Sequence, residues 1–306
     1  MTRSYYGRPV IKEPVWTPEI PWYFFTGGLA GASAGLAYLS GDTPLARRAW
    51  AASLAGAAAS PALLISDLGV PARFFNMLRV FKVTSPMSVG SWILSGAGAS
   101  IGVAAAHALT GRLSGPARVA RPAAALLGLP LSTYTGALIA QTAVPVWHEA
   151  RRELPFVFAA GAALSAGAAA TVLTPPPGAA AARRLTVLGA AAELGGMLLM
   201  EQRLGETGEP YGHGRAGAYK RLGHGLVLAG SLAVAARGRS RPVAVLGGAV
   251  ALGGALLERF SIFNAGWQSA ADPAYTVAPQ RRRVEAGAGH GASRKPPEPA
   301  ATGGRE

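Results

Sequence analysis

The sequence contains no cysteine among its 306 residues. Disulfide bonds, cysteine-ligated iron–sulfur clusters, c-type haem attachment and thiol catalysis are therefore excluded on this chain. If the protein handles electrons, the metal carrier must belong to a partner chain.

Charged residues are also scarce. They make up 14% of the chain, and hydrophobic residues make up 50%, whereas soluble globular proteins carry roughly 25% charged residues. The charges cluster between long uncharged stretches, a layout typical of membrane-spanning helices. The formal net charge is +14, but the arginines lie between apolar runs and not along one polar helix face. We therefore expect basic loops beside membrane lipid and no nucleic-acid partner.

The N-terminal residues do not form a secretory signal. Residues 1–19 contain several charges and prolines, and no small-residue cleavage site follows a short apolar region. We expect residues 1–19 to be an extramembrane segment and the first apolar run to be retained as a span.

Eight apolar runs predict about eight transmembrane helices. The runs cover residues 20–39, 49–65, 87–109, 122–146, 154–173, 185–200, 222–236 and 243–257. The last two are short, because a span usually needs roughly 20 residues. The sequence thus predicts an all-α integral membrane protein with two four-helix bundles over residues 20–263. Residues 264–306 should form a C-terminal extramembrane tail, largely disordered from about 272, where proline, glycine and charge dominate.

The basic residues leave the membrane orientation open. Eight spans would place both termini on one side, which carries 19 Lys and Arg against 10 on the other, but 12 against 10 without the C-terminal tail. The loops opposite the termini contain only one acidic residue, Asp42. Acidic residues count little in the positive-inside rule, so charge alone does not decide the orientation.

Three stretches resemble a known family. They are residues 19–31 at the first span, residues 64–92 around a polar connection, and residues 258–266. Together they resemble the NrfD/PsrC family, the membrane subunits of polysulfide reductase and related molybdopterin oxidoreductases, over roughly residues 16–280. Residues 64–92 are the most specific, because they combine an uncommon polar loop with the start of a span.

The resemblance implies a quinone-binding membrane anchor subunit in a bacterial inner membrane. Such a subunit binds menaquinone or menaquinol and exchanges electrons with a four-cluster ferredoxin-like iron–sulfur subunit, which connects to a molybdopterin catalytic subunit. The chain itself would carry no haem, no iron–sulfur cluster and no catalytic metal.

The resemblance also indicates candidate quinone-binding residues. In the family as usually described, an Asn and a His on the first span and a Tyr on a later span contact the quinone head group. The first span here has neither Asn nor His, and Glu19 and Tyr23, one helical turn apart, are expected to replace them, with Trp22 beside them. Tyr134 matches the later tyrosine. The alternatives are a helix-dipole partner for Glu19, interfacial anchors for Trp22 and Tyr23, and a packed aromatic for Tyr134.

The polar connection between the second and third runs is a candidate docking segment. Residues 67–82 are too charged to span a membrane and suit an amphipathic segment at its surface. We expect Asp67, Arg73, Asn76 and Arg79 to dock the iron–sulfur partner. A structural ion pair between Asp67 and Arg73 is the alternative.

Glu193 lies in the middle of the sixth run, and Glu201 follows two helical turns later. A carboxylate inside a membrane is costly, so an ionisable group there indicates function by default. We expect these two residues to form a proton relay. The alternatives are a Glu that binds a neighbouring helix and a misplaced end of the span.

Two other classes of function are open. One is a helical membrane transporter or channel without a redox role, although the two halves show no convincing repeat. The other is a haem-bearing anchor, which needs two facing histidines. His107 lies near the end of the third run and His224 near the start of the seventh, at different depths, so no metal site is expected.

Overall fold

The computed structural model describes residues 11–277 except 69 and 71, and within them the regular structure is helical with no strand. The long helices are α1 (Glu19–Leu39), α2 (Pro44–Asp67), α4 (Pro86–Thr110), α5 (Ser114–Ala140), α7 (Leu154–Leu173), α8 (Ala180–Leu204), α9 (Gly214–Arg237) and α10 (Arg241–Ala271). The short elements are α3 (Arg73–Arg79), α6 (Pro145–Glu149) and the 3-10 helices η1 (Pro176–Gly178) and η2 (Gly205–Tyr211).

Local sequence signals explain where the helices begin. The Thr43 hydroxyl accepts a hydrogen bond from the backbone N–H of Ala46 at 3.2 Å, and Pro44 occupies the first helical position of α2. Ser85 and Pro86 repeat this arrangement at the start of α4. A capping hydroxyl satisfies a backbone N–H that the helix leaves unpaired, and proline has no N–H to satisfy at that position.

The long helices pack as two groups of four. In the first group, α1 contacts α2 and α5, and α4 contacts α2 and α5. In the second group, α7 contacts α8 and α10, and α9 contacts α8 and α10. Contacts of α1 with α7 and α10, and of α5 with α7, join the groups. The predicted pair of four-helix bundles is therefore found as two groups of helices that share one hydrophobic core.

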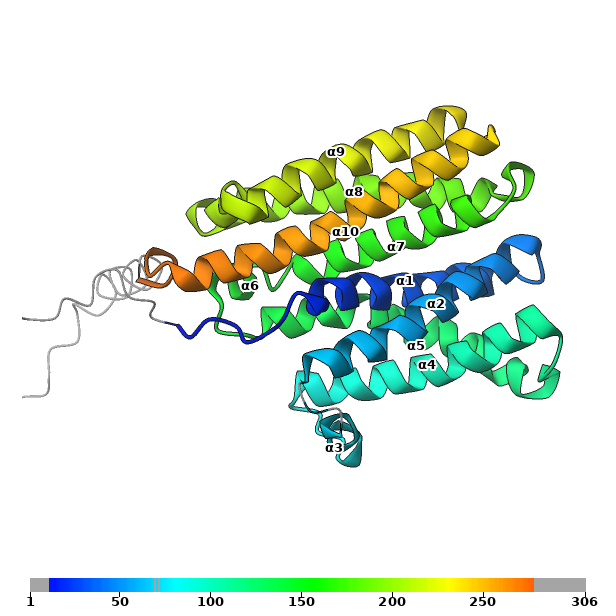
Figure 1. The fold of residues 1–306 in the computed structure, drawn as a ribbon, viewed down its shortest axis with the longest axis horizontal. Coiled ribbons are helices and arrows are strands. Elements are labelled where there is room, and N and C mark those ends of the chain that lie inside the picture. The colour runs from blue at the N-terminus through cyan, green and yellow to red at the C-terminus, as the bar shows by residue number, and fades with distance from the viewer. Residues whose placement is uncertain (1–10, 69, 71, 278–306) are drawn as a thin grey trace, which may run out of the picture.

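The long helices run side by side along the long axis of the molecule (Figure 1). Because each reverses the direction of the one before it, the described chain starts and finishes at the same end, called here the terminal end. The elements α3, α6 and η2 also lie there (Figure 1). The opposite end carries four short connections, which join α1 to α2, α4 to α5, α7 to α8 and α9 to α10.

Several predicted helix limits need correction. The fourth run was expected to continue to residue 146, but α5 ends at Ala140 and Pro145 begins α6. The eighth run was expected to end at 257, but α10 continues to Ala271, so the predicted boundary between 263 and 264 falls inside a helix. Apolar patterning marks only the apolar part of a helix, and charged residues continue it at little cost. Most of the predicted tail, residues 278–306, lies outside the described residues.

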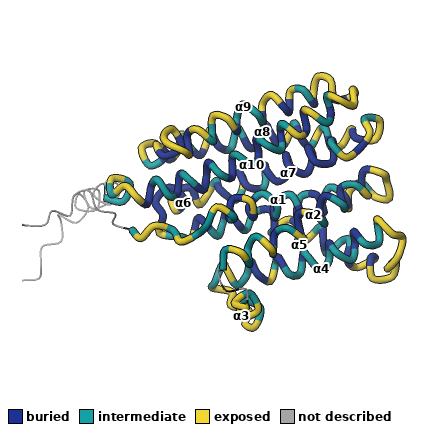
Figure 2. The backbone as a smooth tube through the Cα atoms, viewed as in Figure 1, coloured by how far each residue is buried: buried dark blue, intermediate teal, exposed yellow. Residues whose placement is uncertain are grey.

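Five helices, α2, α4, α5, α7 and α10, are long and apolar enough to cross a membrane. This agrees with a multi-pass membrane protein, although fewer helices meet the apolar criterion than the eight predicted spans. Helices α8 and α9 fall outside this set, because both carry charges along their length. Figure 2 shows that buried positions line the inside of the helix bundle while exposed positions follow its outer faces.

Small residues allow the closest helix contacts. Gly31 of α1 and Gly128 of α5 face each other, and a methyl group at either position would overlap the carbonyl oxygen of the other. Glycine at such crossings lets two backbones approach closely, as is common between membrane helices. This contact sets the position of α1 against α5, which together carry Tyr23 and Tyr134.

Candidate functional site

A small cavity lies in the first helix group at the terminal end. Tyr23 of α1, Asp67 of α2 and Tyr134 of α5 line it, together with Met77 of α3 and Met87 of α4. It is called here the tyrosine cavity. Its volume is about 50 Å³, enough for a water molecule, whose share of liquid volume is about 30 Å³. Five helices therefore converge on one small, mostly apolar space that a few polar side chains enter.

Tyr23 places an unpaired hydroxyl at this cavity. Its side chain is 2% exposed, and among the described residues its hydroxyl has no hydrogen-bond partner. A buried polar group left without a partner costs about 1–3 kcal/mol. The Tyr23 hydroxyl is therefore suited to bind a ligand or a water molecule in the cavity.

Tyr134 of α5 reaches the cavity with its ring packed against the backbone of α4. Its ring lies so close to Gly90 that a methyl group at position 90 would overlap the ring. Glycine at position 90 is therefore what allows the Tyr134 ring to lie against the α4 backbone. The structure brings Tyr134 and Tyr23 to one cavity from helices far apart in the sequence.

Asp67 has a different environment from the one predicted. Its Oδ1 accepts hydrogen bonds from the Thr17 backbone N–H at 2.9 Å and from the Thr17 hydroxyl at 2.6 Å. The alternative ion pair with Arg73 is not formed. Asp67 thus ties the segment before α1 to the end of α2, and its half-buried carboxylate lines the tyrosine cavity.

The other predicted docking residues stay on the surface. Arg73, Asn76 and Arg79 are exposed on α3, which buries none of its residues. Figure 1 shows α3 projecting from the terminal end of the first helix group. Phe75 of the same helix is 70% exposed, so α3 presents both charge and an aromatic ring to the outside.

Glu19 and Trp22 do not line the tyrosine cavity. Glu19 is the first residue of α1, where a carboxylate complements the positive end of the helix dipole. Trp22 is 45% exposed and packs edge-on against Phe260 of α10, with ring centroids 6.1 Å apart. Of the four predicted quinone-binding residues, the structure therefore brings together only Tyr23 and Tyr134.

A buried charge cluster occupies the second helix group. It consists of Glu193 of α8 with Glu258 and Arg259 of α10, each at most 2% exposed. Arg259 Nη2 lies 3.2 Å from Glu193 Oε1, and the guanidinium carbon lies 4.3 Å from the centre of the Phe158 ring. Among the described residues, neither carboxylate accepts a well-directed hydrogen bond. Buried charges usually need such bonds, so this arrangement is suited to water or to proton exchange.

Gly161 of α7 makes room for the ion pair. A methyl group at this position would overlap both the Arg259 guanidinium and the Glu193 carboxylate. The pair therefore lies directly against the α7 backbone, where Arg259 also donates a hydrogen bond to the Phe158 carbonyl oxygen at 3.3 Å. Three helices are needed to build this cluster.

The cluster extends toward the surface of α9 and the terminal end. His224 Nε2 of α9 lies 3.1 Å from Glu258 Oε1, and the imidazole side chain is 31% exposed. Lys220, also on α9, forms an ion pair with Glu201 of α8 at 2.6 Å. Tyr211 of η2 lies near both Glu201 and Glu258: burial raises the pKa of its phenol and these carboxylates raise it further. The phenol therefore stays protonated beside the two carboxylates.

The sequence predicted only part of this cluster. Glu193 and Glu201 were expected to form a relay, but Glu258 and Arg259 were treated as residues beyond the last span. They follow the apolar run without a helix-breaking residue, which is the signal that α10 continues. His224 was considered only as a haem ligand.

The structure separates the two histidines considered for haem. His224 faces Glu258 on α9, whereas His107 Nδ1 lies 2.9 Å from the Arg112 carbonyl oxygen at the far end of α4. Helices α4 and α9 lie at opposite edges of the bundle (Figure 1). Over residues 11–277, apart from 69 and 71, no three His, Asp or Glu side chains are grouped to hold a metal ion.

No family model matches the sequence, and no curated protein matches it. The resemblance to the NrfD/PsrC family therefore remains a prediction. The candidate sites depend on the geometry of this chain alone.

Proposed function

We propose that this chain is an eight-span membrane subunit that binds a menaquinone-type quinone and exchanges electrons with an iron–sulfur partner. The partner would in turn connect to a molybdopterin catalytic subunit, as the NrfD/PsrC resemblance implies. The single observation that carries the proposal is the tyrosine cavity, where two tyrosines from different helices meet and one hydroxyl has no protein partner.

The outer faces of α8 and α9 support a count of eight spans. Leu188, Leu198 and Leu199 of α8, and Leu228 and Leu232 of α9, are each more than half exposed. Large exposed apolar surfaces are rare on soluble monomers, whereas lipid would cover these leucines. The charges of Glu193, Glu258 and Arg259 point inward, as expected for ionisable groups inside a membrane bundle.

The tyrosine hydroxyls suit the chemistry of a quinone head group. A quinone has two carbonyl oxygens that accept hydrogen bonds, and a phenol can donate one to each. Tyr23 and Tyr134 supply such donors from α1 and α5. Asp67 lies at the same cavity and at the terminal end of α2, where its carboxylate could exchange protons with nearby water.

A quinone ring requires the cavity to enlarge. About 50 Å³ holds little more than one water molecule, so side chains must move. Met77 and Met87 line the cavity, and methionine adapts its shape easily. Met77 belongs to α3, which has no buried residue, so α3 is the element expected to move when a quinone enters.

The position of α3 also favours a short electron path. The exposed residues Arg73, Asn76, Arg79 and Phe75 of α3 lie next to the tyrosine cavity, which Met77 of the same helix lines. A partner docked on α3 would bring its cluster close to the quinone head. In this proposal the chain supplies quinone binding and proton exchange, and the partner supplies the metal centres.

The proposal is tested by quinone binding to the purified protein. Menaquinone extracted from the purified chain should be close to one molecule per chain by chromatography with mass detection. The fluorescent quinol analogue heptylhydroxyquinoline N-oxide should bind saturably and be displaced by a soluble menaquinone analogue. If the purified protein carries no quinone and the analogue binds only in proportion to detergent, the proposal is wrong.

The buried charge cluster favours a second candidate, a transporter or channel without a redox role. Glu193, Arg259, Glu258 and His224 form a row of ionisable side chains inside the second helix group. Transporters often place such groups near the middle of a membrane. This candidate predicts proton or ion flux through vesicles that contain the chain alone, with no effect of quinone analogues.

A further inference from the structure

The opposite end of the bundle is strongly basic. The four connections and helix ends there, residues 40–48, 111–121, 174–184 and 237–241, contain ten arginines and a single acidic residue, Asp42. The terminal end has no such imbalance, because acidic residues accompany its basic ones. The opposite end therefore carries a strong positive potential that attracts anions.

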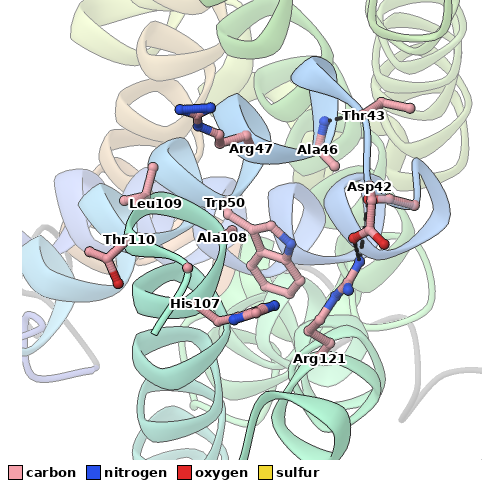
Figure 3. Close-up of a pocket in the computed structure, with 12 residues that line it drawn as sticks. Asp42, Thr43, Ala46, Arg47, Trp50, His107, Ala108, Leu109, Thr110 and Arg121 are labelled. Carbon is pink, nitrogen blue, oxygen red and sulfur yellow. Dashed lines mark hydrogen bonds and ion pairs between the residues drawn. The ribbon is translucent and has the colours of Figure 1, made fainter. Parts of the chain in front are cut away.

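A pocket of about 470 Å³ opens at this end within the first helix group (Figure 3). Its lining includes Arg47 and Trp50 of α2, His107 of α4 and Arg121 of α5, with Asp42 at its edge. It is called here the arginine pocket. Basic side chains thus outnumber the one carboxylate, so the pocket can accept a further negative group.

Trp50 offers the pocket an unused hydrogen-bond donor. The residue is 1% exposed, and among the described residues its indole N–H has no acceptor. In Figure 3 the indole nitrogen lies on the edge of the ring that faces Arg121. A buried donor without an acceptor is costly, so an acceptor oxygen in the pocket would stabilise this arrangement.

Arg121 is held in place but not fully paired. Its Nη2 lies 2.8 Å from Asp42 Oδ1 and donates to the Gly41 carbonyl oxygen at 3.3 Å, while its Nε has no partner in the described part of the chain. Arg47 is exposed and makes no ion pair with a described residue. The start of α2 adds the positive end of a 24-residue helix. A phosphate group suits this set of donors.

Apolar side chains beside the pocket indicate what carries the phosphate. Leu109, which lines the pocket, is 42% exposed, and the nearby Leu113 and Val119 are 50% and 74% exposed. A free anion would leave these side chains uncovered. A phospholipid would cover them with its acyl chains while its phosphate enters the pocket.

We propose that the arginine pocket binds the head group of an anionic phospholipid, with its phosphate between Arg47 and Arg121 and an acceptor oxygen on the Trp50 N–H. The proposal rests on the assignment of the helices as membrane spans but not on quinone binding. Basic pockets between membrane helices commonly bind such lipids. The lipid would join α2, α4 and α5 at the end far from the tyrosine cavity.

The test is lipid binding to the purified chain in a neutral detergent, followed by native mass spectrometry. Phosphatidylglycerol should be retained at one molecule per chain, and phosphatidylcholine with the same acyl chains at least about fivefold more weakly. Arg121→Gln and Arg47→Gln should each weaken phosphatidylglycerol binding about fivefold, as expected for loss of one basic residue near a membrane surface. Trp50→Phe should weaken it severalfold, because Phe keeps a ring but removes the N–H.

Two further variants make the test specific. Arg118→Gln removes the same charge from an exposed position one turn from Arg121, outside the pocket lining, and should leave retention unchanged. Asp42→Asn should tighten binding, because it removes the carboxylate that lines the pocket and pairs with Arg121. If Arg121→Gln does not fold, the exposed Arg47 still provides the test.

Three outcomes would overturn the proposal. Equal retention of phosphatidylglycerol and phosphatidylcholine would show that the pocket does not recognise charge. An equal loss in Arg118→Gln and Arg47→Gln would show diffuse attraction instead of a site. Displacement of the lipid by millimolar inorganic phosphate would identify a site for the free anion. These results can be interpreted in the same way if the protein does not bind quinone.

Discussion

Glu193 of α8 and Arg259 of α10 form an ion pair with an O–N distance of 3.2 Å, and their side chains are 0% and 3% exposed. Glu258, next to Arg259 in the chain, is also buried, and its Oε1 lies 3.1 Å from His224 Nε2. Glu193 and Arg259 should therefore respond to mutation as a pair, whereas Glu258 has His224 as its own neighbour.

Arg259→Gln should be the most destabilising single change in this cluster. It leaves the buried Glu193 carboxylate without its cation, and breaking a buried pair by removing one partner costs about 3–5 kcal/mol. Glu193→Gln should cost less, because Arg259 keeps its hydrogen bond to the Phe158 carbonyl oxygen and its contact with the Phe158 ring. Thermal unfolding in detergent measures both. The double variant should be more stable than Arg259→Gln alone; strictly additive losses would mean that the pair does not interact.

Gly161→Ala should disrupt the same cluster without changing any charge. The added methyl group would overlap both partners of the ion pair, and overpacking typically costs about 1–3 kcal/mol. Gly35→Ala on α1 is the matched control, because no atom lies within 4 Å of the new methyl group. It should be neutral or slightly stabilising, since alanine favours helices. Equal melting temperatures for the two variants would show that α7 does not pack against the pair.

Tyr23→Phe should weaken binding of the quinol analogue without lowering the stability of the protein. In the free protein it removes a buried hydroxyl that has no partner among the described residues, so the melting temperature should stay the same or rise. Affinity for the quinol analogue should fall severalfold, because one hydrogen bond to a ligand contributes about 0.5–1.5 kcal/mol. Tyr38→Phe, on α1 but exposed, should change neither quantity. Unchanged affinity in Tyr23→Phe would remove this residue from the site.

Tyr134→Phe should lower quinol turnover by the whole complex severalfold or more while assembly stays intact, because Phe keeps the ring that lies against Gly90. Dye-linked activity of the catalytic subunit provides the control, since it bypasses the quinone. Gly90→Ala should reduce turnover as well, by displacing the ring. If Tyr134→Phe matches the original protein in both assays, Tyr134 has only a packing role.

Charge reversal on α3 should weaken partner docking without loss of stability. Arg73 and Arg79 are exposed, so Arg73→Glu with Arg79→Glu should leave the melting temperature unchanged. Recovery of the iron–sulfur subunit in affinity purification should fall. Arg118→Glu, at the opposite end of the bundle, is the control and should not affect recovery. Full recovery of the partner with the α3 variant would place docking elsewhere.

The helices themselves could be predicted from the sequence. A helix depends on local patterns such as apolar runs and caps, and each predicted run overlaps a long helix, although the fourth run continues beyond α5 into α6. The limits were wrong where the helix continues past its apolar part, as in α10, because a charged residue such as Glu258 ends an apolar run without ending the helix. The all-α class and the absence of cysteine chemistry also followed from the sequence alone.

Only the tertiary structure decided which residues meet. Tyr23, Asp67 and Tyr134 line one cavity because α1, α2 and α5 pack in a particular rotation, whereas Glu19 and Trp22, on the same helix as Tyr23, point elsewhere. The ion pair of Glu193 with Arg259 likewise needs α8, α10 and the space at Gly161 together. Hydropathy along one helix shows what is apolar, but the direction of each side chain is set by the contacts of its neighbours, which lie far away in the sequence.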